Sequence, residues 1–312
     1  MTQFTYGVDI SKSHLDLSRL PDGAYRRFVY DKSGLRELVK WLSKDDVDRI
    51  VYEATGRYHR TFERCLAKAG FALCKVNPRQ AKRFAEACGQ LTKTDRVDAA
   101  ILARMGVALR PDIDAPASQA IEDMQDLMTA RRALIKDSTA AKNRSEGLSN
   151  PLLKRQNAAR RHQIEKDIAA IEAEVKRLVI EDPVLKARFD ILLSIPGVGE
   201  ITALGLLIDM PELGTLENKE AAALMGLAPR TRQSGSWSGR AAIKGGRGEI
   251  RKALYFPAIV AAKHNPDLKI LYDRLMESGK PFKVVIVAVM RKLTIIANAL
   301  LRKNAKWTQK PA

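Results

Sequence analysis

The sequence lacks the cysteine patterns that mark disulfide frameworks and zinc sites. Its three cysteines, Cys65, Cys74 and Cys88, are odd in number and form no Cys-x-x-Cys pair. Closely spaced pairs are typical of zinc sites, and even numbers at regular spacing are typical of secreted disulfide-rich proteins. The pattern therefore predicts reduced, half-buried thiols in the core of a cytosolic protein.

Long hydrophobic segments are also missing. The longest apolar run, Val284 to Met290, ends at Arg291-Lys292 and is too short to span a bilayer, which needs about 20 apolar residues. The first residues, MTQFTYGVDIS, lack the basic and apolar regions of a signal peptide. No basic amphipathic anchor stands out. We therefore expect no membrane partner and a cytoplasmic location.

Acidic and aromatic residues are both scarce. The 312 residues include 36 Asp and Glu against 54 Lys and Arg, which gives a net charge of +18 and a pI of about 9.9. Such an excess repels itself unless a polyanion offsets it, and phosphates bind basic residues with release of counterions. The composition therefore predicts a nucleic-acid partner. Aromatic residues, at 6%, are too few for a stacking platform for single strands.

Residues 1–115 are expected to form an α/β domain. Alternating apolar residues predict a three-stranded meander at TYGVDIS, HLDLSRL and YRRFVY, and later strands at DRIVYEAT and FALCKVN. Helices are predicted at 35–43, 58–69 and 78–109, the last with a break near Gly89. Strands that alternate with helices are typical of α/β folds. This order of elements is that of a ribonuclease-H-like fold.

Residues 116–183 are expected to form an antiparallel helical hairpin with coiled-coil packing. The sequence GLSNP at 147–151 predicts the turn. The seam should pack within the chain, although exposed seam positions leave dimerisation open. Its apolar residues follow the 4, 3, 4, 3 spacing of a coiled coil: Ile164, Ile168, Ile171, Val175 and Leu178.

Residues 184–312 are predicted to be mainly helical. The sequence SIPGVGE at 194–200 predicts a helix-hairpin-helix-like segment, whose turn leaves N–H groups where a phosphate can sit. The same turn also occurs for purely structural reasons. A basic, glycine- and serine-rich stretch from Pro229 to Gly248 is expected to be flexible, and an apolar helical tail begins at Ile250.

Four acidic residues from distant segments are candidates for one metal site. Asp9 and Glu53 end the first and fourth predicted strands, which are parallel neighbours in a ribonuclease-H-like sheet. Asp95 and Asp98, in KTDRVDA, are three residues apart, so one helical face carries both. Clustered carboxylates repel one another unless cations neutralise them. We therefore predict two Mg²⁺ ions about 4 Å apart, with Mn²⁺ as an alternative, which stabilise the attacking and leaving oxygens of phosphoryl transfer.

Each acid also has a structural interpretation. Asp95 at a helix start interacts favourably with the helix dipole, Asp98 suits a solvated surface, and Glu53 suits a strand end. Taken singly, each of these is at least as good an account as a metal ligand. Their coincidence at positions where this fold places its ligands favours the metal site.

Several motifs resemble one family of transposases. GVDISK, YEATGRYH, VNPRQAKRFAEACG and KTDRVDA are similar to the N-terminal domain of DEDD transposases of the insertion sequence 110 family, including its insertion sequence 1111-like subgroup. SIPGVGEITA and GLAPRTRQSGSWSGRAAIKGGRGEIRKALY are similar to the family's C-terminal transposase domain. The family's N-terminal domain resembles Holliday-junction resolvases of the ribonuclease-H class. The resemblance implies that Asp9, Glu53, Asp95 and Asp98 are the catalytic DEDD quartet.

The resemblance also implies a serine nucleophile. The family joins DNA through a serine in a motif that reads Gln233-Ser234-Gly235 here, with Ser236 and Ser238 close by. No histidine lies in the segment, so the acidic metal site is the expected activator. Without the resemblance, a phosphate-binding loop would be the better interpretation. The basic residues expected to contact nucleic acid are Arg230, Arg232, Arg240, Lys244, Arg247, Arg251 and Lys252.

The partners are implied by the resemblance as well. Members of the family use a non-coding bridge- or seeker-type RNA of their own element to select donor and target DNA. The family's composite site takes its acids and its serine from different protomers. This implies at least a dimer, and the expected assembly is a tetramer built as a dimer of dimers. The expected function is RNA-guided recombination that excises and inserts a mobile element, close to the nucleoid of a bacterial cytoplasm.

Other functions stay open at this level. A Piv-type site-specific DNA invertase would share the same residues without a guide RNA, and inverted sites beside the gene would favour it. A structure-selective junction nuclease would hydrolyse DNA without using a serine. A non-catalytic nucleic-acid-binding protein would bind no metal.

Overall fold

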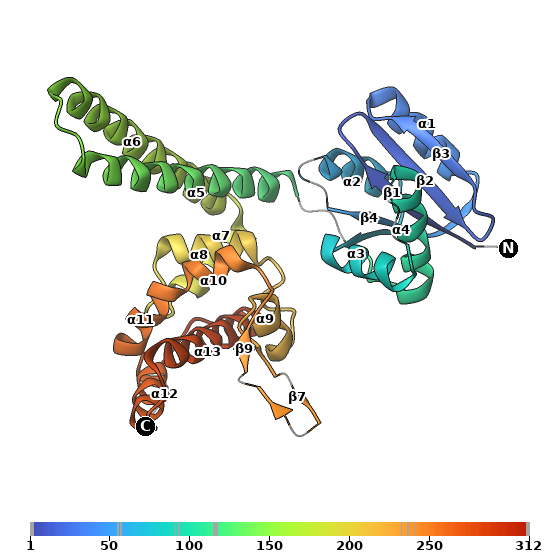
Figure 1. The fold of residues 1–312 in the computed structure, drawn as a ribbon. Helices are drawn as coiled ribbons and strands as arrows, with labels where there is room; N and C mark the ends of the chain where they lie inside the picture. The colour runs from blue at the N-terminus through green and yellow to red at the C-terminus, as the bar shows by residue number, and fades with distance from the viewer. Residues whose placement is uncertain are drawn as a thin grey trace. The chain divides into compact units, whose positions relative to one another are not determined.

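The computed structural model describes residues 3–309 apart from a few internal positions. The chain divides into two units, Met1–Ala117 and Ser118–Ala312, and each is described by itself (Figure 1). The predicted helical hairpin belongs to the second unit, and the finer boundary at 183/184 stays a prediction. The residues outside the description are 1–2, Thr55, Arg57, Leu91, Lys93, 115–117, Arg232, Ser236, Arg240 and 310–312.

The first unit is built on a mixed five-stranded sheet. Its strands are β1 (Gln3–Ile10), β2 (His14–Leu20), β3 (Tyr25–Val29), β4 (Asp46–Glu53) and β5 (Leu73–Val76). Their order is β3-β2-β1-β4-β5, with antiparallel pairing in β1-β2-β3 and parallel pairing among β1, β4 and β5. The predicted meander, the two later strands and the α/β class of this part of the chain are confirmed.

Helices cover both faces of this sheet (Figure 1). They are α1 (Lys32–Leu42), α2 (His59–Lys68), α3 (Pro78–Ala87) and α4 (Asp95–Leu109). Successive side chains of a strand point to opposite faces. Tyr6 and Val8 of β1 therefore pack with α1 and α2, whereas Val51 of β4 packs with α3 and α4.

Two glycines let α4 lie against the sheet. A Cβ on Gly7 of β1 would lie 2.1 Å from the carbonyl oxygen of Ala99 and 2.2 Å from the backbone nitrogen of Ala103, both in α4. A Cβ on Gly106 of α4 would lie 2.6 Å from the side chain of Thr5. No larger residue fits at either position without a shift of backbone or side chain. This contact holds α4 against the strand that carries Asp9.

The second unit begins with the predicted antiparallel hairpin, α5 (Gln119–Glu146) and α6 (Pro151–Glu181) (Figure 1). The Asn150 side chain caps α6 by accepting a hydrogen bond from the N–H of Leu152 at 2.9 Å. Val175, at the predicted seam, is fully buried in the core of the second unit. The mainly helical nature of this unit is confirmed.

The remaining helices of the second unit share one core with the hairpin. A Pro-Gly turn joins α7 to α8, the first two of these helices. A Cβ on Gly197 in this turn would lie 2.5 Å from the Cβ of Ala261. This close contact supports the structural interpretation of the turn. The helices are α7 (Pro183–Leu193), α8 (Glu200–Asp209), α9 (Asn218–Leu224), α10 (Gly248–Ala253), α11 (Tyr255–His264), α12 (Pro266–Glu277) and α13 (Phe282–Lys303).

The glycine- and serine-rich stretch contains paired strands, which the sequence-based prediction of flexibility did not include. β6 (Pro229–Arg230) pairs antiparallel with β9 (Ala242–Ile243), and β7 (Gln233–Ser234) pairs with β8 (Trp237–Ser238) between them. Two-residue strands are too short to show an alternating apolar pattern, so sequence periodicity does not reveal them.

Two expectations about apolar and sulfur-containing residues need refinement. α13 is long and apolar enough to cross a membrane by length and composition. Half of its most apolar stretch is nevertheless buried inside the second unit, where Ile286 and Leu293 pack in the core. It is therefore a core helix.

Cys74 is buried and Cys65 is partly buried as expected, whereas Cys88 is exposed at the end of α3. The prediction of a half-buried thiol was wrong for Cys88.

Candidate active site

Three carboxylates come from neighbouring strands of the first unit. Asp9 on β1 is directly opposite Asp16 on β2 in the antiparallel register. Val8 of β1 pairs with Tyr52 of β4, so Asp9 and Glu53 occupy the next position along each of these strands. Strand alternation places the acids on the face opposite Val8 and Tyr52, which is the face that α4 covers.

Two further carboxylates lie in the first turn of α4. The Thr94 side chain caps this helix by accepting a hydrogen bond from the N–H of Val97 at 3.3 Å. Asp95 is exposed and Asp98 is partly buried. The contact of α4 with Gly7 holds this first turn on the face of the sheet that carries Asp9.

The electrostatics show that these acids lie close together. The pKa of Asp9 is raised from 3.8 to about 6, chiefly by burial and then by the negative charges of Asp95, Asp98, Asp16 and Glu53, in that order of importance. Like charges disfavour ionisation of a neighbouring carboxyl group. The structure thus brings together the four acids selected from the sequence, and adds Asp16.

Asp16 and Arg27 were missed by the sequence analysis. Asp16 is fully buried, and its Oδ1 accepts hydrogen bonds from Arg27 Nε at 2.9 Å and from the Tyr25 hydroxyl. Arg27 Nη2 donates to Asp95 Oδ2 at 3.0 Å, which connects β3 to α4. The available signal was the acid at an inward position of HLDLSRL, because buried acids need a partner.

The donor set suits a hard divalent cation. All five acids offer oxygen ligands, which Mg²⁺ and Mn²⁺ prefer. Asp16 Oδ2 is buried and has no hydrogen-bond partner, which leaves an uncompensated oxygen beside Asp9. Within the part of the chain that the structure describes, no three His, Cys, Asp or Glu side chains already have metal-holding geometry. The acids are therefore neighbours that fit a cation without forming a closed cage.

The candidate nucleophile lies in the second unit. Ser234 is exposed on β7 and pairs with Trp237 on β8. Gly235 follows with a φ of 56°, a conformation that glycine adopts without strain. The alternative serine, Ser236, lies outside the described residues.

The basic residues near this serine have different environments. Arg247 donates to both carboxylate oxygens of Glu212, at 2.7 and 2.5 Å, and Arg251 donates to the carbonyl of Gly245 at 2.6 Å. Lys252 forms an ion pair with Glu249 at 2.8 Å.

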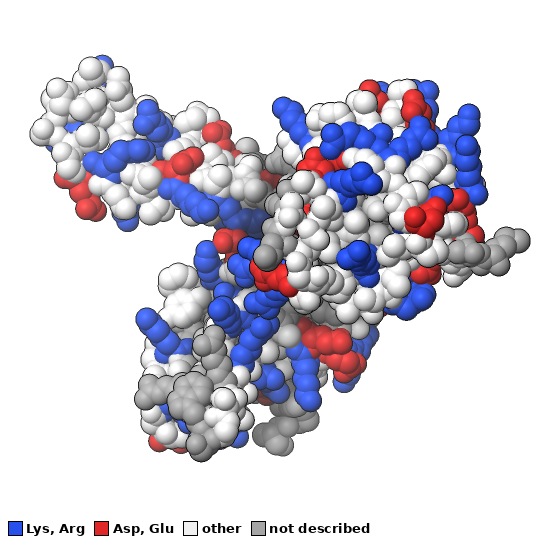
Figure 2. All heavy atoms as spheres, turned by 45° about the vertical axis from the view of Figure 1, so that its right-hand side comes forward, with Lys and Arg blue, Asp and Glu red and all other residues white. Residues whose placement is uncertain are grey.

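Other members of the predicted basic set are more available. Arg230 and Lys244 are exposed and form no ion pair within the described part of the chain. Arg232 and Arg240 lie outside the described residues. Arg230 and Lys244 are therefore the best-placed of the described predicted residues to contact a phosphate. Figure 2 shows lysine and arginine side chains over the visible surface, with smaller acidic groups between them.

Two family models match the chain. A DEDD model of IS110 type, described as a transposase, matches residues 6–149. A model described as the transposase IS116/IS110/IS902 family matches residues 189–273. The first match contains all five acids discussed above, and the second contains Ser234.

Curated relatives show two patterns of similarity. The pilin gene-inverting protein of Moraxella bovis is 29% identical over 99% of this chain and 99% of its own length, and that of Moraxella lacunata matches equally. A protein of insertion element IS110 from Streptomyces coelicolor is 32% identical over 43% of this chain and 32% of its own length.

Proposed function

Because the chain belongs to the IS110 family of transposases and is an enzyme of DNA recombination, we propose that it is an RNA-guided recombinase that excises and inserts a mobile element. The observation that carries the chemistry is the position of Asp9 among Asp95, Asp98, Asp16 and Glu53. The sheet order β3-β2-β1-β4-β5, with acids at the ends of β1 and β4, supports a ribonuclease-H-like domain.

The acidic residues would hold the cation and keep it at the reacting phosphate. Divalent ions bound there would stabilise the charge of the attacking and leaving oxygens. Asp9, Glu53, Asp95 and Asp98 are the proposed ligands, and Mg²⁺ is the proposed ion. Asp16 is held too deeply to face solvent, so its proposed task is to anchor Arg27 and Asp95.

Ser234 is the proposed nucleophile. Its Oγ loses its proton and forms a bond to phosphorus while the bond from phosphorus to the leaving sugar oxygen breaks, and the leaving oxygen takes up a proton, so that no net proton is consumed. The phosphoserine conserves the energy of the phosphodiester, so a second strand's hydroxyl can later attack phosphorus and release the serine. Arg230 and Lys244 lie in the same segment and would contact the phosphate.

The guide and the assembly are inferred from the family resemblance. An element-encoded non-coding RNA would select donor and target DNA, and the net charge of +18 suits a protein that binds RNA and two DNAs. A dimer of dimers would supply acids and serine from different protomers.

A second candidate has an observation of its own. The pilin gene-inverting proteins match this chain over 99% of both lengths, whereas the IS110 protein matches 43% of it. This full-length match favours a site-specific DNA invertase, which would use the same residues on inverted sites and need no guide RNA.

Co-purification tests guidance by RNA. The protein is expressed with the DNA that flanks its gene, and bound RNA is sequenced after a moderate-salt wash. One discrete RNA from that DNA, with recombination lost after ribonuclease treatment, is the expected result. Heterogeneous cellular RNA, with recombination resistant to ribonuclease, would instead support the invertase.

A variant tests the acidic site separately. Asp98→Asn should abolish strand cleavage but retain nucleic-acid binding, because it removes a metal ligand and no basic contact. Full recombination by this variant in Mg²⁺ would reject the metal site.

A further inference from the structure

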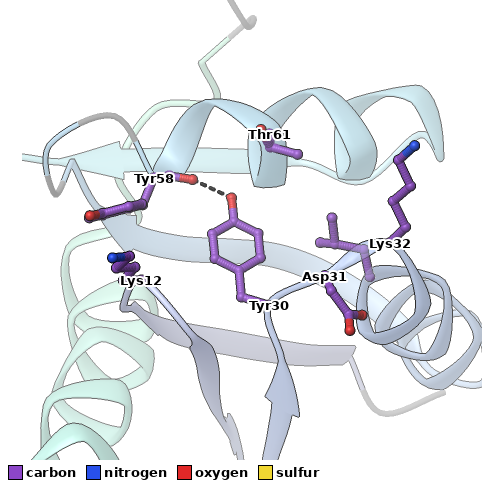
Figure 3. Close-up of a pocket in the computed structure, with 7 residues that line it drawn as sticks. Lys12, Tyr30, Asp31, Lys32, Tyr58 and Thr61 are labelled. Carbon is purple, nitrogen blue, oxygen red and sulfur yellow. Dashed lines mark hydrogen bonds between the residues drawn. The ribbon is translucent and has the colours of Figure 1, made fainter.

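A pocket of about 340 Å³ opens in the first unit, outside the acidic site (Figure 3). Figure 3 shows Tyr30 at its centre, with Lys12 and Tyr58 on one side of the ring and Asp31 and Lys32 on the other. These residues come from the segment after β1, the end of β3, and the starts of α1 and α2. None of them has a role in the chemistry described above.

Tyr30 fixes the shape of this pocket. Its hydroxyl donates a hydrogen bond to the carbonyl of Tyr58 and accepts one from the N–H of Phe62 at 3.0 Å. Tyr58 is thereby held at the start of α2, while 42% of its surface remains exposed. The low aromatic content argues against a platform for several bases, but one exposed ring on a fixed backbone is a surface on which a single base can stack.

The pocket also offers two exposed cations. Lys12 and Lys32 are exposed, and neither forms an ion pair within the described residues. Among the lining residues that the structure describes, Asp31 is the one carboxylate, and it accepts a hydrogen bond from the N–H of Gly34 at 2.8 Å and so caps α1. Two exposed ammonium groups and an exposed aromatic ring match the phosphates and the base of a nucleotide.

The pocket and the acids lie at the same edge of the sheet. Lys12 follows the end of β1, which carries Asp9, and Tyr58 follows the end of β4, which carries Glu53. The pocket lies on the side of α1 and α2, whereas the acids face α4. A strand that passes around this edge would reach both places.

We propose that this pocket binds a single-stranded segment of the DNA next to the phosphate that is cut, with Lys12 and Lys32 contacting phosphates and Tyr58 stacking on a base. A paired base inside a duplex has no free face for the ring, so the segment is unpaired. The inference rests on the proposed function, because the occupant is the DNA on which the acidic site acts.

The test measures binding of a short fluorescent single-stranded DNA of mixed sequence by anisotropy. Full-length protein is used in EDTA, so that no strand is cut, and the salt concentration is varied. Lys12→Gln and Lys32→Gln should each weaken binding about threefold to tenfold and reduce the salt slope by about 0.7. Tyr58→Ala should weaken it about tenfold, whereas Tyr58→Phe retains the ring and the affinity.

Lys44→Gln is the matched control, because Lys44 is exposed beyond the other end of α1 and loses the same charge. Its affinity should stay within about twofold of wild type. Equal effects of Lys12→Gln and Lys44→Gln on affinity, or no effect of Tyr58→Ala, would overturn the proposal that this pocket binds single-stranded DNA. A defect seen only with RNA of the same sequence, or equally with duplex DNA, would overturn the assignment to single-stranded DNA.

Asp98→Asn separates this inference from the proposed function. It should bind the oligonucleotide as wild type does. If the pocket variants lose binding while cleavage proves independent of Asp98, the pocket stands and the acidic site is rejected. If Asp98 is essential and the pocket variants bind normally, the pocket is rejected and the acidic site stands.

Discussion

Asp9 and Asp16 lie directly opposite each other on β1 and β2, and they differ in how their charge is balanced. Asp16 has the guanidinium of Arg27 at 2.9 Å. Asp9 is surrounded by acids, and burial together with their charge raises its pKa to about 6. Opposed like charges destabilise a sheet. The pair therefore costs stability that a bound cation would restore.

The raised pKa of Asp9 predicts a pH dependence of stability. The folded protein holds this proton up to about pH 6, whereas the unfolded chain releases it near 3.8, so stability falls as pH rises between these values. Above pH 6 Asp9 is ionised in the folded protein, and this lowers the free energy of unfolding by about 1 to 2 kcal/mol after allowance for solvent screening. Asp9→Asn should therefore raise the thermal unfolding midpoint of metal-free protein at pH 7.

The control for this prediction is the pH at which the difference disappears. Near pH 3, below the pKa of Asp9 in both the folded and the unfolded chain, the two proteins are almost uncharged at this position, and their midpoints should nearly agree. Mg²⁺ should raise the midpoint of wild type at pH 7 more than that of the variant. A midpoint for Asp9→Asn below that of wild type in metal-free buffer at pH 7 would contradict the account.

Arg27 is predicted to position Asp95. Arg27→Gln breaks the connection from Asp16 to Asp95, and small misplacements of a reacting group are costly. Strand cleavage should fall about tenfold to a hundredfold, while half-saturating DNA concentration changes little. The matched control is Arg26→Gln, because Arg26 lies on the same strand but stacks on Phe28. Equal losses in both variants would show a general effect of charge.

Gly7 is predicted to control the distance between α4 and the sheet. Gly7→Ala places a Cβ against backbone atoms of α4, so the helix must shift, at a cost of about 1 to 3 kcal/mol. The rate of strand cleavage should fall as well, because the shift of α4 moves Asp95 and Asp98 away from Asp9. Gly147→Ala is the control, since that position has open space and a φ of −97°. Denaturant unfolding of both variants gives the comparison.

The sequence predicts the strands and helices of the first unit because their apolar residues repeat at intervals of 2 and 3.6. Asp9, Glu53, Asp95 and Asp98 could be selected because they lie at element ends, where the topology brings them together. The contact of Arg27 with Asp95 could not be predicted, since two residues 68 positions apart, one on a strand and one at a helix start, leave no local pattern. Exposure of Cys88 likewise depends on how α3 packs.

The last prediction concerns Ser234. If its hydroxyl attacks the phosphate, a DNA strand should become attached to the protein through a phosphoserine. A denaturing gel of labelled DNA with protein would show the adduct in wild type and none in Ser234→Ala. Ser234→Ala should still bind RNA, DNA and metal, because the exposed hydroxyl supports no core contact. Recombination should fall at least a thousandfold, roughly the loss expected when a nucleophile is removed.

Ser236→Ala is the matched control, since it removes the same group two residues along the chain. An adduct that persists in Ser234→Ala but vanishes in Ser236→Ala would transfer the role to Ser236. No adduct in any variant, with cleavage still dependent on Asp98, would show that water is the nucleophile. The acidic site would then act alone, as in a hydrolytic junction nuclease, and Ser234 would only contact the phosphate.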